Sequence, residues 1–469
     1  MSTQSIGTIA ARLDRLPASR WHNKILWLLG LGILADCLDL YLGGSVLAAL
    51  VASGWSNNEL NGYFISGTMA GFLVGALIAG SVGDKLGRKK ALTYNLIFFG
   101  TSSIAAAFAT DMWTLIWLRS IMGMGLGAQF VATYGTFGEF LPPLSRGKYA
   151  SLVALIGNVG PPVATVIAML VLPLFGWRPL FFGVGVFAFV VLILQNLYLV
   201  ESPRWLACKG LIDQADKIVT QAEKEIEAQR GIKLPPVEIT GPPEECVNLP
   251  YMAIFKGQLL YRTIALTAGL CGVNVAIYTM VNWIPTIFVQ AGLTVTKSLA
   301  MTTVILLGAP FGMWVCSLVV DNVPRKGAMV FILLAMSVVG YIYALQRAEF
   351  LIMSVGFVLI TLLYFYVSLV CSVYAGEIFP TEARLRGVGF ANGVSRLSAV
   401  VTPPVIALIL THYGPVAVFL TVSAILVLIA GVIAVFGVET RHKTLEEINE
   451  HLVGRGASHG SSQSSSKNM

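Results

Sequence analysis

The sequence predicts an all-α integral membrane protein with twelve transmembrane helices. Hydrophobic residues make up 56% of the 469 residues and charged residues only 12%, whereas a soluble domain is usually about one quarter charged. The apolar residues form long blocks, and a helix needs roughly 20 of them to cross the hydrocarbon core. A transmembrane β-barrel would instead show short segments in which apolar and polar residues alternate. Helices therefore remain the way to satisfy the backbone groups in lipid.

The apolar blocks fall into two sets of six that are separated by a polar segment. We place the spans near residues 25–50, 61–82, 91–110, 112–138, 148–173, 178–200, 261–289, 298–320, 327–346, 350–376, 387–411 and 415–438. The predicted organisation is a cytoplasmic N-terminal segment (1–24), a six-helix lobe (25–200), a cytoplasmic linker (201–260), a second six-helix lobe (261–440) and a largely disordered cytoplasmic tail (441–469). Within the linker, the charged stretch from Asp213 to Arg230 predicts a surface helix.

The positions of the 31 Lys and Arg residues predict the orientation of the chain in the membrane. Most of them fall in the terminal segments, the linker and the loops on the same side, whereas the opposite loops hold only Arg178, Lys297 and Arg347. Positive charge is retained on the cytoplasmic side of a membrane. We therefore expect a multi-pass protein of the plasma (inner) membrane with both termini in the cytoplasm. This topology also explains the net charge of +7 without a nucleic-acid partner.

Two sequence echoes, that is, pairs of similar segments at equivalent places in the two halves, indicate that the lobes are related. GEFLPPLSRGK at 138–148 is similar to GEIFPTEARLRGVG at 376–389, and GSVGDKLGRKK at 80–90 is weakly similar to SLVVDNVPRKG at 317–327. Parallel repeats of six spans are typical of carriers whose lobes rock about a binding site near the membrane midplane. The sequence therefore predicts transport by alternating access.

Several motifs resemble those of the major facilitator superfamily. Gly80, Asp84, Gly87, Arg88 and Lys89 look like its loop signature, and Arg119, Gly123, Gly125 and Gly127 look like its fourth-span motif, RxxxGxG. The ends of spans six and twelve, which begin at Glu201 and Glu439, are similar to the sugar-porter branch. In span one, the run from Asp36 to Tyr41 resembles the DGxDLY run of the aromatic acid:proton symporters, with Cys37 in place of the glycine. Trp283, Pro285, Arg396 and Pro403 look like that group too.

Three charged residues predict a proton-coupling element within the membrane. A charged side chain at the centre of a span costs about 2.5–3.5 kcal/mol on insertion scales, so each one is a functional candidate. Asp36 and Asp39 share one face of span one, and Arg119 on span four is expected at a similar depth. Burial raises the pKa of a carboxyl group and a nearby guanidinium lowers it, so a carboxylate whose arginine partner moves away can take up a proton. The resemblance to sugar porters implies the same role; a permanent ion pair that only joins the two spans is the alternative.

Arg396 is the predicted contact for an anionic substrate. It is expected near the midplane of span eleven, and a guanidinium can bind a carboxylate through two parallel hydrogen bonds. The alternative is that Arg396 reaches toward the interface or bonds to carbonyl groups. Candidate contacts for the rest of the substrate are tyrosines and amides, although packing is the alternative for each: Tyr41, Tyr134, Tyr278, Tyr364, Tyr366, Gln129 and Asn274.

A second set of charges recurs at the cytoplasmic ends of both lobes. The resemblance to sugar porters implies that acid–base pairs of this set hold the inner side closed while the carrier faces outward. Loop charges that only set the topology are the alternative. The set comprises Asp84, Arg88, Glu139, Arg146, Glu201, Arg204, Glu377, Arg384, Glu439 and Arg441.

Together these patterns predict a monomeric secondary transporter that couples a proton to the uptake of a small organic acid. A proton-coupled sugar or polyol symporter is the alternative, because Gln129 and Asn274 suit a sugar, and a drug or metabolite antiporter is a weaker one. An enzyme is not expected, since all five histidines lie at span ends or in tails and suggest neither catalyst nor metal site. No cofactor is expected either, because the sequence contains no phosphate-binding loop for ATP.

Overall fold

The computed structural model describes residues 3–141, 143–231, 233–237, 251–379 and 381–440. These residues form helices and no strand, so the all-α prediction is confirmed. Contacts divide the chain into two compact units. Unit 1 comprises Met1–Glu245, Tyr278–Leu307 and Val400–His412, and unit 2 comprises Cys246–Ile277, Gly308–Ala399 and Tyr413–Met469. The units differ from the two halves of the sequence, and the division of the chain at the linker stays a prediction.

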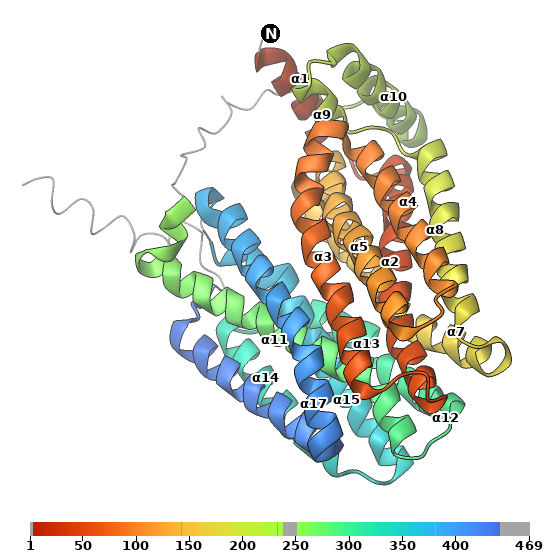
Figure 1. Ribbon diagram of the computed structural model, residues 1–469. Coiled ribbons are helices and arrows are strands. Elements are labelled where there is room, and N and C mark those ends of the chain that lie inside the picture. The colour runs from red at the N-terminus through yellow and green to blue at the C-terminus, as the bar shows by residue number, and fades with distance from the viewer. Residues whose placement is uncertain (1–2, 142, 232, 238–250, 380, 441–469) are drawn as a thin grey trace, which may run out of the picture. The chain divides into compact units, whose positions relative to one another are not determined.

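Unit 1 is a bundle of long helices (Figure 1). Two of them begin at side-chain caps, because Asn57 accepts a hydrogen bond from Leu60 N and Asp111 accepts one from Thr114 N, which satisfies free backbone N–H groups. The second half of the chain adds α12, the end of α11 and part of α17. The helices are α2 (Arg20–Ala52), α3 (Asn58–Leu86), α4 (Arg88–Ala107), α5 (Met112–Phe140), α6 (Pro143–Asn158), α7 (Gly160–Phe175), α8 (Arg178–Tyr198), α11 (Gly257–Gln290), α12 (Val295–Leu306) and α17 (Thr381–Phe436).

Three short helices pack together at one end of unit 1: α1 (Thr3–Asp14), α9 (Pro203–Cys208) and α10 (Ile212–Arg230) (Figure 1). The surface helix predicted between Asp213 and Arg230 is α10 and is confirmed. Arg12 and Arg15 of α1 both form ion pairs with Glu223 of α10, each at 2.6 Å. Burial alone would raise the pKa of Glu223. The hydrogen bonds from the two arginines lower this pKa by more, so it lies below its usual value. We call this the linker end of unit 1, and the opposite end the far end.

Unit 2 holds the other parts of the second half. Its α15 continues without a break into a π-helix, η3, and Tyr374 at the end of η3 shares hydrogen bonds with the backbone N–H and carbonyl of Val438. The first part of α11 and the rest of α17 also belong to this unit. Its remaining elements are η1 (Tyr251–Phe255), α13 (Gly308–Val319), η2 (Val320–Asn322), α14 (Arg325–Leu345), α15 (Glu349–Val367), η3 (Ser368–Tyr374) and α16 (Ala375–Glu377).

All twelve predicted spans lie on helices. Ten helical stretches of the described residues are long and apolar enough to cross a membrane. One of them, Gly387–Phe436, holds the last two predicted spans, which meet at Gly414, where φ is 78° and ψ is 179°. The remaining predicted span coincides with α4, which is helical but less apolar than the ten. The helices are thus consistent with twelve crossings.

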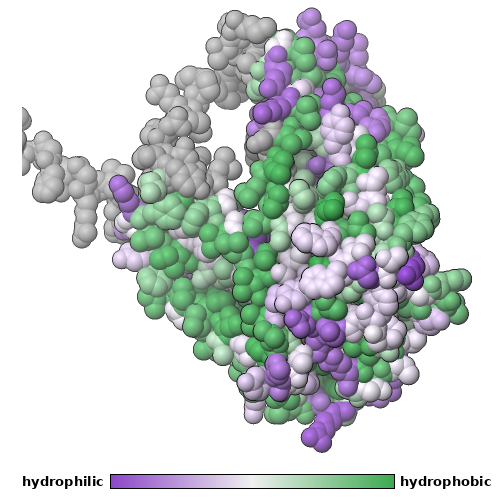
Figure 2. Space-filling model, in the orientation of Figure 1, coloured by the Kyte–Doolittle hydropathy of each residue, from purple (hydrophilic) through white to green (hydrophobic). Residues whose placement is uncertain are grey.

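The surface of unit 1 has the character expected of a membrane protein. Figure 2 shows hydrophobic residues along the flank of the bundle, whereas hydrophilic residues gather over α1 and α10. Large apolar side chains that would be buried in a soluble protein are exposed, and they include Leu77, Trp117, Leu170, Ile193 and Leu197. Continuous exposed apolar surface of this kind marks contact with lipid or with other proteins.

Glycines bring α3 and α5 into contact backbone to backbone. A carbon atom added at Gly123 or Gly127 of α5 would overlap the backbone carbonyl of Thr68 or Phe72 on α3. Gly71 and Gly75 of α3 meet α5 in the same way. Two glycines of the RxxxGxG motif are therefore needed because only a residue without a side chain permits this close approach. The packing also fixes the position of the arginine that begins the motif.

We expect Gly127→Ala to lower the melting temperature, because the added methyl group must push α3 away from α5. Overpacking of a tight interface typically costs about 1–3 kcal/mol. Gly135→Ala on the same helix is the matched control, since a carbon atom added there meets no other atom within 4 Å. Thermal unfolding of both variants in detergent checks this expectation. Equal melting temperatures would show that the interface is not tight.

Candidate functional site

A buried ion pair joins α2 and α5 in unit 1. Arg119 Nη1 donates to Asp39 Oδ2 at 2.7 Å, and the two side chains are only 1% and 0% exposed. The pairing that the sequence suggested between spans one and four is therefore present. Removing one member of a buried ion pair is strongly destabilising, by roughly 3–5 kcal/mol, because the other charge stays in the interior without a partner.

Aromatic rings surround the guanidinium of Arg119. Its central carbon lies 4.8 Å from the centre of the Phe64 ring and 5.5 Å from that of Phe181. Such contacts stabilise a cation while they exclude water. Arg119 Nε and Asp39 Oδ1 have no hydrogen-bond partner among the described residues. The second oxygen of Asp39 is thus free to accept a proton while the first holds Arg119.

Asp36 lies on the same face of α2 but does not share this ion pair. It is 7% exposed, and neither of its carboxylate oxygens has a hydrogen-bond partner among the described residues. A buried ionised carboxylate without a partner is unstable, so a group in this setting favours its neutral form. The two aspartates that the sequence placed together therefore have different surroundings.

Two buried side-chain amides pack against α2 at Gly32, one helical turn before Asp36 in the sequence. A carbon atom added at Gly32 would lie 2.7 Å from Gln129 Nε2 and 3.4 Å from Gln195 Nε2. Gln195 donates to the carbonyl of Leu28 at 2.8 Å. The side-chain carbonyl oxygens of Gln129 and Gln195 have no partner among the residues described. Gln195 was missed at the sequence level, although a lone glutamine inside an apolar span could have indicated it.

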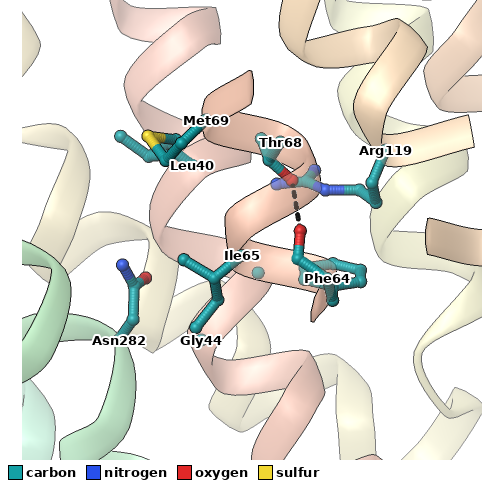
Figure 3. A pocket seen from close by; sticks show the side chains of 9 residues that line it. Leu40, Gly44, Phe64, Ile65, Thr68, Met69, Arg119 and Asn282 are labelled. Atoms are coloured by element: carbon teal, nitrogen blue, oxygen red, sulfur yellow. Dashed lines mark hydrogen bonds between the residues drawn. The ribbon is translucent and has the colours of Figure 1, made fainter. Parts of the chain in front are cut away.

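A small cavity opens beside the ion pair (Figure 3). Arg119 and Thr68, whose hydroxyl donates to the carbonyl of Phe64 at 2.8 Å, lie on one side, and Asn282 of α11 lies on the other. The cavity has room for about one water molecule. Its lining residues are Leu40, Gly43, Gly44, Phe64, Ile65, Thr68, Met69, Arg119 and Asn282.

The other substrate candidates of unit 1 are tyrosines. Tyr41 and Tyr278 are buried on α2 and α11. Tyr134 on α5 packs against Phe130, with 4.8 Å between the ring centres. Tyr41 follows Asp39 by two residues, so the tyrosine and the ion pair belong to the same turn of α2.

The remaining candidates belong to unit 2. Asn274 of α11 donates to the carbonyls of Leu270 and Ser395 at 3.1 and 3.0 Å, and Tyr366 donates to the carbonyl of Gly269 at 3.1 Å. These bonds hold α11 against α17 and α15. Tyr364 is buried. Arg396 is half-buried on α17 and lies near enough to Cys371 for an electrostatic interaction.

At the linker end of unit 1, the predicted gate charges form one connected network. Arg88 pairs with Glu139 at 2.6 Å and with Asp84 at 2.7 Å. Glu201 accepts hydrogen bonds from the backbone N–H groups of Arg88 and Lys89, so it caps the first turn of α4. A carboxylate at a helix N-terminus also interacts favourably with the helix dipole.

Arg204 extends this network to the N-terminal helix. It donates to the backbone carbonyl of Glu139 at 3.0 Å and pairs with Asp14 of α1 at 2.6 Å. Asp14 was missed at the sequence level, because nothing in its local pattern indicates a partner 190 residues away.

Unit 2 repeats the arrangement with equivalent residues. Glu439 accepts hydrogen bonds from the backbone N–H groups of Arg325 and Lys326 at 2.7 and 3.1 Å, and so caps α14 as Glu201 caps α4. Arg325 pairs with Glu377 at 3.4 Å. Arg325 was missed as a site residue, although the echo between 80–90 and 317–327 aligns it with Arg88.

Three predicted gate residues lie beyond what the structure describes: the side chains of Arg146 and Arg384, and all of Arg441. The role of the whole set as a gate stays a prediction.

Comparisons with known proteins agree with this fold. Residues 45–452 match the family described as Sugar (and other) transporter. The chain is 41% identical to the inner membrane metabolite transport protein YdjE of Escherichia coli over 94% of its length and 98% of that protein. It is 27% identical to the niacin transporter NiaP of Acinetobacter baylyi, over 94% of this chain and 99% of NiaP.

Among solved structures, the inward-open xylose transporter XylE of E. coli has the same fold. The TM-score is 0.74 at 19% identity, with 91% of this chain and 99% of XylE covered. The long apolar helices and the match to a transporter family define a membrane transporter. The chain belongs to the Sugar (and other) transporter family of the major facilitator superfamily. It is a transporter of small molecules and not an enzyme.

We expect Glu201→Ala to speed hydrogen exchange at the amides of Arg88 and Lys89, because the first turn of α4 loses its cap. Loss of a helix cap costs about 0.5–2 kcal/mol. Glu201→Gln keeps an acceptor oxygen and should show a smaller effect. Glu439→Ala should act in the same way on α14. Exchange mass spectrometry in detergent checks both, and unchanged exchange in α4 would contradict the assigned cap.

Proposed function

We propose that the protein is a proton-coupled symporter that takes up a small organic acid. The observation that carries the proposal is the fully buried Asp39–Arg119 ion pair, in which one carboxylate oxygen holds the arginine and the other is free of described partners. A proton can bind to this second oxygen without displacing the first contact.

Protonation of Asp39 would cancel its charge and leave Arg119 as a buried cation. Such a cation is unstable unless it gains water or another partner, so protonation favours a different arrangement of the helices around it. Conversely, an arrangement that keeps Arg119 close to Asp39 favours release of the proton. The pair thus links proton binding to conformation, which is what symport requires. The fold of XylE, a proton:xylose symporter, is in keeping with this mechanism.

The proposal that the substrate is an organic acid depends on Arg396 and on the named substrate of a related protein, NiaP. Arg396 carries a fixed positive charge in the interior of a helix long and apolar enough to span a membrane. A guanidinium recognises a carboxylate by two parallel hydrogen bonds. Niacin, which NiaP is named for transporting, is an aromatic carboxylic acid. A compact ring with one carboxylate therefore fits the charge of Arg396.

A sugar or polyol is the second candidate substrate. The family description and the likeness to XylE favour it. The buried amides of Gln129 and Gln195 supply further support, because their carbonyl oxygens have no described partner and could accept hydrogen bonds from hydroxyl groups. The distinction between the two candidates depends on the charge of the substrate.

We also infer an inner-membrane location with both termini in the cytoplasm, from the distribution of Lys and Arg between the loops. In this orientation the linker end of unit 1 faces the cytoplasm. The Arg88–Glu139 and Arg325–Glu377 pairs would then lie at the inner surface, where breaking and forming them can gate access.

We expect Asp39→Asn to abolish accumulation driven by a pH gradient, because asparagine cannot bind the coupled proton. Exchange of labelled for unlabelled substrate should continue, since exchange needs no net proton movement. Uptake and counterflow of radiolabelled niacin in proteoliposomes measure the two activities. The double variant Asp39→Asn with Arg119→Gln is the control for folding, because it also removes the charge of Arg119 that Asp39→Asn leaves without a partner. Normal concentration of substrate by a folded Asp39→Asn variant would disprove the coupling assignment.

We expect wild type to bind niacin more tightly than nicotinamide, its neutral amide, and Arg396→Gln to lose this preference. Hydrogen bonds to a charged group contribute about 1.5–3 kcal/mol, which corresponds to one to two orders of magnitude in affinity. Arg396→Lys keeps the charge without the planar fork and should restore only part of the preference. Competition with labelled substrate provides the affinities. Equal binding of acid and amide by wild type, together with saturable uptake of xylose, would favour the sugar alternative.

A further inference from the structure

The cavity beside the Asp39–Arg119 pair is closed on one side by a residue from the second half of the chain. Asn282 lies on α11 in the part that belongs to unit 1, and it faces Arg119 across the cavity (Figure 3). The residue is 4% exposed. A cavity of this size can hold about one water molecule, and Arg119 forms part of its wall.

The backbone of α11 approaches that of α2 closely at this point. A carbon atom added at Gly44 would lie 3.0 Å from the carbonyl oxygen of Asn282 and 3.1 Å from its Cα. Only a glycine leaves room for this crossing without displacement of α11. The contact therefore fixes Asn282 against the helix that carries Asp39.

Hydrogen bonds from α3 to α11 and α17 continue toward the far end. Gln290, two turns beyond Asn282 and about 12 Å further along α11, donates to Asn58 at 2.6 Å, and Asn58 donates to Thr411 at 3.2 Å. Ser66 donates to the carbonyl of Val400 at 2.7 Å. Asn282 thus borders the cavity beside Gly44, which follows Asp39 on α2 in the direction of the far end.

We propose that Asn282 is the seal that prevents protons from reaching Asp39 from the far end of unit 1 while α11 is packed on α2. The proposal rests on the proton-coupled function above. When α11 moves away from Gly44, water from the far end gains access to the cavity. A hydronium ion that passes from there to Asp39 transfers its proton to Oδ1, so that one O–H bond breaks in the hydronium, which becomes water, as another forms on the carboxyl group.

Among the residues that line the cavity, Arg119 is the charged one, and Asp36, Cys37 and Tyr41 are the titratable neighbours of Asp39 on α2. The residues of α3, α8 and α11 that line the cavity or contact Arg119 are uncharged: Phe64, Thr68, Phe181 and Asn282. The seal is therefore steric. Removal of the carboxamide should open the cavity without altering the charges that hold the ion pair.

The test measures proton entry in the absence of substrate. Purified protein is reconstituted into liposomes that contain a pH-sensitive dye, and a membrane potential is imposed with potassium and valinomycin. We expect Asn282→Ala to admit protons at least about tenfold faster than wild type, which corresponds to roughly 1.4 kcal/mol of lost barrier. Asn282→Ser, a smaller change, should leak in the same direction. Asn282→Leu, which keeps the bulk of the side chain, should stay as tight as wild type.

Thr286→Ala is the matched control. Thr286 is buried one turn further along α11, at 1% exposure, and does not line the cavity, so this variant should not leak. In the double variant Asn282→Ala with Asp39→Asn, the leak should disappear because its proton acceptor is gone.

A leak that persists in the double variant would overturn the proposal, since protons would then bypass Asp39. Asn282→Ala and Asn282→Ser variants that admit protons no faster than wild type would also overturn it, provided that wild type moves protons when niacin is added. If wild type moves substrate without protons, the proposed coupling fails instead. The wild-type substrate experiment thus separates failure of the seal from failure of the proposed function.

Discussion

The Asp39–Arg119 pair is stable in this packing only while it is neutral as a whole, because both side chains are removed from water and aromatic rings surround the guanidinium. This requirement constrains the helices that contribute to it. α2 supplies the carboxylate, α5 the guanidinium, α3 and α8 the rings, and α11 the residue that closes the adjacent cavity. A shift of any one of these helices changes the stability of the charged state. Conversely, a change of charge on Asp39 alters the preferred packing of all of them.

The fourth-span motif joins this electrostatic constraint to a steric one. Arg119 begins the motif, and Gly123 and Gly127 follow it on successive turns against the backbone of α3. Gly125 points to another neighbour, where an added carbon atom would lie 3.0 Å from Phe99 of α4. Four residues of one helix thus hold three helices at fixed distances and place one charge. The close packing leaves little freedom for Arg119 to find a different partner without a concerted movement.

Sequence patterns predicted the helices and the ion pair because both follow from local rules. Apolar blocks define spans, and a charge inside a span requires a partner at its own depth. Asp14 and Asn282 could not be assigned in this way, because their neighbours are distant in the sequence and depend on how helices cross. The sequence also could not predict which of Asp36 and Asp39 pairs with Arg119. They lie three residues apart on one face of the helix, and only the tertiary packing distinguishes their surroundings. Arg325 was within reach through the internal echo, which aligns it with Arg88.

The π-helix Ser368–Tyr374 affects how this chain can be compared with its relatives. A π-turn is equivalent to one residue inserted into an α-helix, so every residue after it is rotated by about 100° relative to the preceding register. Tyr374 reaches Val438 from this rotated face, and Glu439, which caps α14, follows directly. A homologous helix without the π-turn would align correctly only with a one-residue gap in the middle of a membrane span. An ungapped alignment there would assign residues after the π-turn to the wrong side of the helix.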